Sequence, residues 1–226
     1  MIGIGVSDEA RAAFLGWSIG LLELEGLLPR AKSPAFVSEV ERIEAGIKER
    51  YGGMSRKELA ACEAARGYAE HFAAAGKAYP VLLQVGAIAS KGRRLTMPDC
   101  LVQAMFAAEL ESMLLTAGHD LAALSGPVTL GLASGSESMP TLGGAEKEPP
   151  AGDLVMRDSV GIFASALLGP DSRSSIGPGT ERLLFVVYAP PEVSTARLDA
   201  HLDELASLAT SACPGLRSGG AETMRL

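Results

Sequence analysis

A helical spacing of apolar residues dominates the stretch from Met97 to Leu121. Pro98 suits the first helical position, where its missing N–H costs nothing, and Gly118 suits a left-handed C-cap. The apolar residues recur every three or four positions, so the helix can be covered on more than one side; they are Leu101, Val102, Met105, Phe106, Leu110, Met113, Leu114 and Ala117. We therefore predict one long buried helix in the middle of the domain, with the rest of the chain packed around it.

The stretch before this helix carries the pattern of a helical hairpin. Ser33 caps a first helix that has one apolar stripe and stops at Gly52-Gly53. Ser55 and Glu58 then form a capping box at the start of a second helix, which ends at Gly76. The pattern is typical of two helices that pack against each other and cover a core.

Apolar segments bounded by glycine, proline and polar residues predict strands, most of them after residue 118. The predicted strands are Ile2–Val6, Trp17–Leu24, Val128–Leu132, Leu154–Met156, Gly161–Leu167 and Leu183–Tyr188. Two further helices are predicted over Val81–Ala89 and Glu192–Ala212. Because helices gather early and strands late, we predict an α+β fold in which the central buried helix packs against a mixed or antiparallel β-sheet.

The pattern predicts a single unit over residues 1–214. Within it, residues 1–78 supply two strands and the helical hairpin, and residues 79–214 supply the central helix, the sheet and the final helix. We expect residues 215–226 to form a flexible tail, because chain ends after a last helix are often loosely held.

Composition and charge narrow the classes of function. The 226 residues include 27 acidic and 20 basic side chains, a net charge of −7 that argues against tight, non-specific nucleic-acid binding and against a DNA partner. No apolar run reaches the roughly 20 residues of a membrane span, and no signal peptide is recognisable, so we expect a cytoplasmic protein. Three cysteines, Cys62, Cys100 and Cys213, lie far apart and match neither a zinc site nor a disulfide framework. We expect no metal and no cofactor, and the sequence carries no signal for an oligomeric state.

The polar cluster most suggestive of chemistry is Asp171-Ser172-Arg173-Ser174-Ser175, which follows a predicted strand. Such a loop can orient a substrate through hydroxyls and backbone N–H groups, or it can be a solvated connection between strands. The sequence contains no phosphate-binding glycine loop, nucleophile elbow or paired-histidine metal motif.

The order of elements from about Tyr79 to Ala212 resembles the editing domain of the bacterial phenylalanyl-tRNA synthetase beta subunit, and more closely its free-standing relatives. The resemblance rests on the order and spacing of its segments more than on any one motif. The matching segments are Lys91-Gly92, Pro98–Ala117, Gly118–Leu121, Gly126–Leu132, Thr141–Gly144, Asp153–Gly161, Asp171–Ile176, Thr180 and Leu183–Tyr188. In the synthetase this domain hydrolyses tyrosine wrongly esterified to the phenylalanine tRNA. The resemblance implies the same fold, a tRNA partner bound at its aminoacylated 3′ end, and a site between the central helix and the strands.

Carried over position by position, the resemblance places Gln103 where the family has an asparagine on the central helix. Ala166 and Leu167 fall at a small Ala-Gly pair that shapes the amino-acid pocket, so leucine narrows that pocket. His119 stands where the family has an aromatic ring, while the family's editing histidine and glutamate have no counterpart here. The resemblance therefore implies a deacylase that prefers small or aliphatic aminoacyl groups over tyrosyl.

An aminoacyl ester is already activated, so a positioned water, oxyanion donors and a general base can hydrolyse it. Asp171, Glu109 and His119 are candidate bases; alternatively, Glu109 is the solvated edge of its helix and His119 an aromatic filler. We predict catalytic roles for Asp171, Gln103 and His119, and substrate-binding roles for Ala166, Leu167, Ser172, Arg173 and Ser174. One cavity is expected to be bordered by Gln103, Ala166, Leu167, Asp171, Ser172 and Arg173.

The resemblance and the polar loop favour hydrolysis of mischarged aminoacyl-tRNA in trans. The missing histidine and glutamate counterparts and the acidic charge favour the alternative, non-catalytic binding of an amino acid, an aminoacyl-tRNA end or a partner protein. For tRNA contact we expect a basic site formed by Lys91, Arg93 and Arg94, which otherwise serve as cations at a helix carbonyl end.

Overall fold

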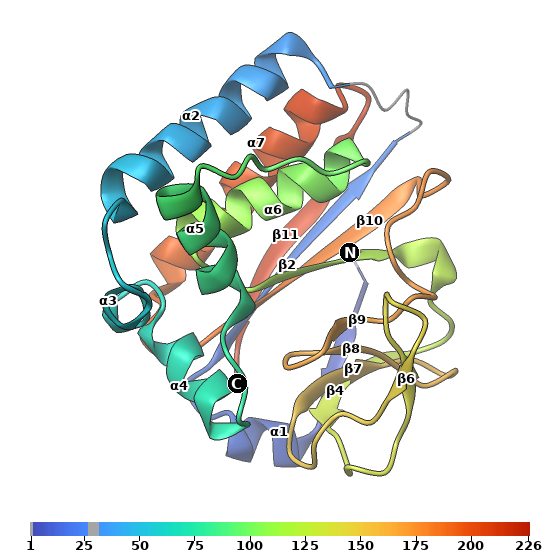
Figure 1. Ribbon diagram of the computed structural model, residues 1–226. Coiled ribbons are helices and arrows are strands. Elements are labelled where there is room, and N and C mark those ends of the chain that lie inside the picture. Colours follow the sequence, from blue (N-terminus) through green and yellow to red (C-terminus); the bar gives the residue numbers. More distant parts are fainter. Residues whose placement is uncertain (1, 27–31) are drawn as a thin grey trace.

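The computed structural model describes residues 2–26 and 32–226, which form three layers (Figure 1). A helical layer covers one face of a four-stranded antiparallel sheet, and a second sheet covers the other face. The strand order of the middle sheet is β11-β2-β10-β3, with β11 at Arg217–Arg225, β2 at Ser18–Glu25, β10 at Arg182–Ala189 and β3 at Thr116–Asp120. The α+β class predicted from the sequence is confirmed.

The helical layer contains most of the chain before residue 113 and the last helix. Its members are α2 (Pro34–Tyr51), α3 (Arg56–Ala61), α4 (Arg66–Ala74), α5 (Pro80–Lys91), α6 (Cys100–Ser112) and α7 (Thr195–Ala212). Helix α6 is buried and packs against α2, α5, α7 and β3, so the central position predicted for it is confirmed. Among the described residues, no helix is both long enough and apolar enough to cross a bilayer.

The second sheet has the strand order β1-β4-β7-β8-β9, in which β1 runs parallel to β4 and the other pairs are antiparallel. Its strands are β1 (Ile4–Val6), β4 (Val128–Leu132), β7 (Leu154–Arg157), β8 (Ile162–Ser165) and β9 (Gly169–Pro170). Helix α1 (Asp8–Ala13), the 3-10 turn η1 (Leu121–Ala123) and the small β5–β6 hairpin (Met139–Pro140 and Glu146–Lys147) complete the fold.

Strand β10 shows why the middle sheet is apolar on both sides. Leu183, Phe185 and Val187 pack into the helical core, whereas Leu184 and Val186 pack against the second sheet. A strand covered on both faces reads as a continuous apolar run, which is the pattern of Leu183–Tyr188. The sequence therefore located this strand, although its two partners could not be deduced.

The predicted long helix over Met97–Leu121 is wrong at both ends. Asp99, rather than a residue before Pro98, is the N-cap, since its side chain accepts from Leu101 N and Val102 N. At the other end Met113 adopts a left-handed conformation (φ 59°), after which the chain enters β3. Apolar runs of this kind fit a buried helix or a buried strand equally well, and pairing with β10 decides for the strand.

Gly118 is therefore a strand residue and not a helix cap. A Cβ atom at this position would lie 2.6 Å from Ile176 Cδ1 and 3.1 Å from Met105 Sδ. The side chains of Ile176 and Met105 thus approach β3 so closely that they would have to shift to admit any side chain at this position.

The predicted flexible tail is also wrong. Residues Arg217–Arg225 form strand β11, which pairs antiparallel with β2 along its whole length. The segment lies at the edge of the sheet, where many side chains face solvent, and its polar, glycine-containing sequence gave little β signal.

The helical hairpin is present but its second arm is broken. The caps at Ser33 and Ser55 occur as predicted, including the complete capping box between Ser55 and Glu58. The second arm divides into α3 and α4 because the chain leaves the helical conformation at Cys62 (φ −60°, ψ 139°).

Candidate functional site

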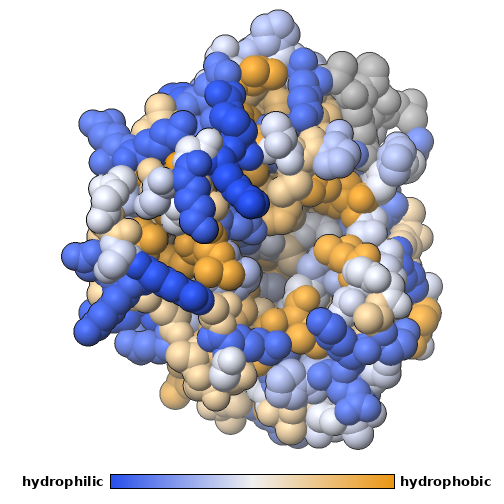
Figure 2. Space-filling view, viewed as in Figure 1, coloured by the Kyte–Doolittle hydropathy of each residue, from blue (hydrophilic) through white to orange (hydrophobic). Residues whose placement is uncertain are grey.

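A cavity of about 430 Å³ opens beside β3, between the helical layer and the second sheet. Its wall comes from the α4–α5 connection, the start of β3, the β8–β9 turn and one residue of β10; the lining residues are Phe72, Lys77, Ala78, Pro80, Leu115, Thr116, Ala117, Ser165, Ala166, Leu167, Leu168, Gly169, Pro170 and Tyr188. Figure 2 shows the surface hollowed between the helical half and the lower strands, with apolar residues along the hollow. We refer to this space as the interlayer cavity.

Apolar groups make up most of the interlayer cavity wall. Phe72 and Leu115 lie on the helical side, and Ala166 and Leu167 lie on the β8–β9 turn. Lys77 is exposed at the edge of the cavity. Apolar walls with a few polar groups are typical of sites for small organic ligands.

Ser165 and Tyr188, in the wall of the interlayer cavity, belong to a buried polar group whose third member, Asp153, does not itself line the cavity. The Ser165 hydroxyl accepts from the Leu168 N–H at 2.9 Å and donates to the Asp153 carboxylate. Asp153 directly precedes β7 and lies next to Ser165 because β7 and β8 are paired. Two buried atoms of this group, Asp153 Oδ1 and Tyr188 Oη, have no hydrogen-bond partner among the described residues. We call Asp153, Ser165 and Tyr188 the cavity group.

Burial sets the charge state of the cavity group. It raises the pKa of Asp153 to about 6, against the opposing effect of the Ser165 hydroxyl, nearby backbone N–H groups and the Lys77 charge. Burial, together with the nearby Asp153, also raises the pKa of Tyr188 well above its ordinary value. The group therefore offers a carboxyl that changes charge near pH 6 and a hydroxyl that remains a donor.

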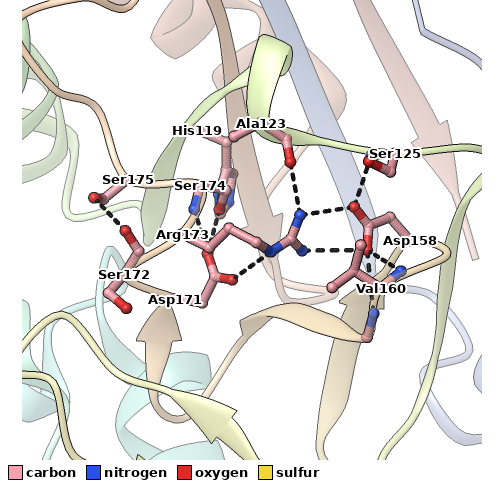
Figure 3. A network of polar contacts seen from close by, with 11 residues as sticks. His119, Ala123, Ser125, Asp158, Val160, Asp171, Ser172, Arg173, Ser174 and Ser175 are labelled. Carbon is pink, nitrogen blue, oxygen red and sulfur yellow. Dashed lines mark hydrogen bonds and ion pairs between the residues drawn. The ribbon is translucent and has the colours of Figure 1, made fainter.

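The predicted polar loop takes part in a different arrangement, shown in Figure 3. The guanidinium of Arg173 pairs with the buried Asp158 through two nitrogens, at 3.0 and 3.2 Å, and donates to the Ala123 carbonyl at 2.7 Å. Burial tends to raise the pKa of Asp158, but Arg173 and the N–H groups of Ser125, Val160 and Gly161 outweigh it and hold the pKa below its usual value. The loop is thus tied to the turn between β7 and β8.

A second part of the same network joins the loop to β3. The Ser174 hydroxyl bonds to Asp171 Oδ1 at 2.5 Å and to His119 Nδ1 at 2.8 Å. Asp171 Oδ2 lies 3.3 Å from the Arg173 guanidinium. Because a carboxylate only accepts, Ser174 donates to Asp171 and the Nδ1–H of His119 donates to Ser174. We call His119, Asp158, Asp171, Arg173 and Ser174 the clamp network.

His119 lies in the interior of the clamp network. Burial, and then the charge of Arg173, lowers the pKa of His119 to about 3, so the ring is neutral at physiological pH. Its edge packs against Phe163, and its Nε2 atom meets no partner among the described residues. This position agrees with the alternative in which His119 is an aromatic filler.

The predicted single cavity is not formed as expected. Ala166 and Leu167 line the interlayer cavity, whereas Asp171, Ser172, Arg173, Ser174 and His119 are absent from its wall. Gln103 is absent from it too, and its buried amide donates to the Leu95 carbonyl at 2.7 Å. The residues of the polar loop therefore contact one another, and Ala166 and Leu167 lie at a separate site, the interlayer cavity.

Glu109, considered as a candidate base, is fully buried and is not a solvated helix edge. Its carboxyl accepts from the Thr116 N–H at 2.9 Å, behind the β3 wall of the interlayer cavity. Burial raises the pKa of Glu109 to about 8, only partly offset by that hydrogen bond.

The three predicted RNA contacts differ in their surroundings. Lys91, Arg93 and Arg94 are all exposed near the C-terminal end of α5. Arg94 pairs with Glu41 and Glu44, each at 2.8 Å. Lys91 and Arg93 form no ion pair with any described residue.

Sequence reasoning missed the cavity group. Asp153 lies within a segment that matched the family, but its position directly before a buried strand was not interpreted. Tyr188 ends the apolar β10 run, and nothing in that run marks it as a cavity residue. A polar side chain at the end of an otherwise apolar strand was the available signal in both cases.

No family model matches this chain, and no curated protein matches it. Among solved structures, it is similar to an N-terminal fragment of the phenylalanyl-tRNA synthetase beta-subunit from Pyrococcus horikoshii, with a TM-score of 0.46 and 10% sequence identity. The match covers 99% of this chain and 52% of that chain, so this chain spans about half of that fragment. The similarity is distant.

Proposed function

We propose that the protein hydrolyses the ester bond of mischarged aminoacyl-tRNA in trans and that the aminoacyl group occupies the interlayer cavity. The observation that carries the proposal is the cavity group: Ser165 and Tyr188 line an apolar cavity of about 430 Å³, and the buried Asp153 carboxylate accepts from the Ser165 hydroxyl. That volume lies in the range of small-ligand sites. The order of motifs that resembles the editing domain supports the choice of substrate.

In this proposal the apolar wall holds the amino-acid side chain. Ala166 and Leu167 limit its size, and Lys77 at the edge faces the phosphates of the tRNA end. The ester carbonyl lies toward Tyr188, whose hydroxyl donates to the oxygen as negative charge develops there.

The proposed reaction uses water as the nucleophile. Water attacks the ester carbon while its proton passes to the Ser165 hydroxyl, and Ser165 passes its own proton to ionised Asp153. The tetrahedral intermediate then releases the ribose hydroxyl, which takes the proton back from Asp153. Free amino acid and uncharged tRNA are the products. Asp153, Ser165 and Tyr188 thus take the roles that the sequence analysis gave to Asp171, Gln103 and His119.

The test follows loss of labelled amino acid from a panel of tRNAs charged with small, aliphatic and aromatic residues. The wild-type protein is expected to hydrolyse at least one ester above the spontaneous rate, and Asp153→Asn to lower that rate by about 100-fold or more. The wild-type rate is expected to rise as pH increases through about 6, where Asp153 loses its proton. Glu49→Gln, on the exposed surface of α2, is the matched control.

Binding of aminoacyl-tRNA without hydrolysis would overturn the enzymatic proposal in favour of the binding module. Hydrolysis that Asp153→Asn leaves intact would show that another group is the base. A circular dichroism melt of each variant separates loss of chemistry from loss of folding.

A further inference from the structure

Two of the three cysteines meet in the core, although the sequence gave no reason to expect it. Cys100 is the first residue of α6 and Cys213 is the C-cap of α7. Their sulfur atoms lie 3.3 Å apart, and both side chains are buried. Both are small residues of the core, and the structure adds a contact between them that their spacing in the sequence does not indicate.

The packing of α6 against α7 holds the two sulfurs together. The Ser112 hydroxyl, at the end of α6, bonds to His201 Nδ1 in α7 at 2.9 Å. The contact between Cys100 and Cys213 lies at the opposite ends of the same helices. The two helices thus run antiparallel, and two contacts along their length fix the register that places the thiols side by side.

We propose that Cys100 and Cys213 form a redox-responsive modification site, in which a peroxide converts the thiol pair into a reversible disulfide. A disulfide needs a sulfur–sulfur distance of about 2.05 Å, so the atoms must approach by little more than about 1 Å. In this proposal, rotation of the two cysteine side chains supplies the movement. Both cysteines lie at helix ends, where local opening is least costly, and a peroxide is small enough to enter by such openings.

The proposed step balances with one molecule of peroxide. The thiolate of Cys100 attacks one peroxide oxygen, which gives a sulfenic acid and releases the other oxygen as water. Cys213 sulfur then attacks the sulfenic sulfur and displaces its hydroxyl as a second water. Two thiols are oxidised to one disulfide, and the peroxide is reduced to two waters. A thiol reductant reverses the change.

The cross-link would join residues that are 113 positions apart in the chain. Closing so long a loop reduces the conformational freedom of the unfolded chain, and in the entropic account the stabilisation grows with loop length. The oxidised protein is therefore expected to unfold at a higher urea concentration than the reduced protein.

The experiment uses the full chain with Cys62→Ser, which removes the one cysteine that is only partly buried. Protein treated with hydrogen peroxide, and untreated protein, are denatured, alkylated and weighed by intact mass spectrometry. After oxidation we expect no alkylation, a mass lower by two hydrogen atoms, and a cross-linked peptide containing residues 100 and 213. Dithiothreitol should restore both alkylation sites and the lower denaturation midpoint.

Two results would overturn the proposal: both cysteines alkylated after peroxide treatment, or sulfinic and sulfonic acids on them without a cross-link. The variants Cys62→Ser/Cys100→Ser and Cys62→Ser/Cys213→Ser should show no oxidation-dependent rise in the midpoint. The mass result on Cys62→Ser alone decides the proposal if either of these variants folds poorly.

Discussion

The clamp network and the cavity group are both clusters of buried acids and hydroxyls, yet they have opposite surroundings. In the clamp network, Arg173 bridges Asp158 and Asp171, and Ser174 joins Asp171 to His119. In the cavity group, Asp153 Oδ1 and Tyr188 Oη have no hydrogen-bond partner among the described residues; Tyr188 and Ser165 line the interlayer cavity, and Asp153 is joined to it through Ser165. Both clusters keep unpartnered atoms among the described residues, His119 Nε2 in the clamp network among them, but only the cavity group has members, Ser165 and Tyr188, in the wall of the cavity.

This comparison teaches that a conspicuous polar loop is weak evidence for a site. Five consecutive polar residues stand out in sequence because they form a loop that must satisfy its own backbone and side chains. A single buried carboxyl such as Asp153 is less conspicuous in the sequence, but burial raises its pKa, and perturbed pKa values are frequent at functional sites. The useful question for each residue is whether it has an unsatisfied atom and also lines a cavity, or is hydrogen-bonded to a residue that does.

The largest expected effect is loss of stability when the clamp network is broken. Arg173→Ala would leave Asp158 and Asp171 buried without their cation, and removing one partner of a buried ion pair costs about 3 kcal/mol or more. Urea denaturation at pH 7 should show this loss, while any hydrolysis per folded molecule should change little. If Arg173→Ala abolishes hydrolysis while the unfolding free energy stays unchanged, the clamp network has a role in catalysis and the contrast with the cavity group is wrong. Arg157→Ala is the matched control, since its partner Glu137 is partly exposed.

Much of the fold could be predicted because local signals and tertiary packing agree. Ser33 and the Ser55–Glu58 capping box fixed two helix starts, and Val128–Leu132 was located to the residue. The central helix was drawn too long because its apolar run continues through Leu114 into β3, and only pairing with β10 distinguishes strand from helix. Strand β11 was missed because its β-conformation depends on β2 and not on its own sequence.

The candidate site could be predicted only in part. Ala166 and Leu167 line the interlayer cavity, as the resemblance implied for an amino-acid pocket. The role of Asp153 depends on its distance from Ser165 and on its burial, and neither quantity is encoded in local spacing. Cys100 and Cys213 show the same limit, since their contact arises from the antiparallel packing of α6 and α7.

The next largest expected effect is a dependence of the unfolding free energy on pH, which Glu109 causes. Its pKa of about 8 in the folded protein lies above the ordinary 4.5, so the native state holds more protons than the unfolded state between these values. The stability of the wild-type protein should therefore fall as pH rises from about 4.5 to 8. Glu109→Gln keeps an acceptor for the Thr116 N–H and removes this dependence.

Urea denaturation of wild type and Glu109→Gln at pH 5 and pH 7 measures this effect. We expect the difference in unfolding free energy between the two proteins to change by about 2 kcal/mol in favour of the variant at pH 7. Asp153 contributes equally to both proteins and so cancels. Parallel pH profiles of the two proteins would show that Glu109 is charged in the folded protein. Glu109 would then resemble the ion-paired Asp158 and would no longer be an example of a buried, neutral acid.

A smaller effect is expected on substrate choice. Leu167 lies on the β8–β9 turn in the cavity wall, so Leu167→Gly should enlarge the cavity without removing a strand residue. A change of one methylene group in a hydrophobic pocket alters the activation free energy for one substrate relative to another by about 1–3 kcal/mol. The rate of tyrosyl-tRNA hydrolysis relative to the best wild-type substrate should therefore rise about tenfold or more. Leu142→Gly, at an exposed position, is the control. Wild-type preference for tyrosyl-tRNA would contradict the steric role of Leu167.

The smallest expected effect is on tRNA binding, and it compares a surface cation that has ion-pair partners with one that has none. Arg94 is held by Glu41 and Glu44, whereas Arg93 has no ion pair among the described residues, so Arg93 is the better placed to meet a phosphate. Arg93→Ala should weaken tRNA binding and reduce the slope of log affinity against log salt by slightly less than about 1, the value for one phosphate contact. Arg94→Ala, measured in the same titration, should leave the slope nearly unchanged, because its charge is already neutralised. Equal slopes for wild type and both variants would assign these arginines to the helix end and move the tRNA contact elsewhere, with Lys77 at the edge of the interlayer cavity as the next residue to test.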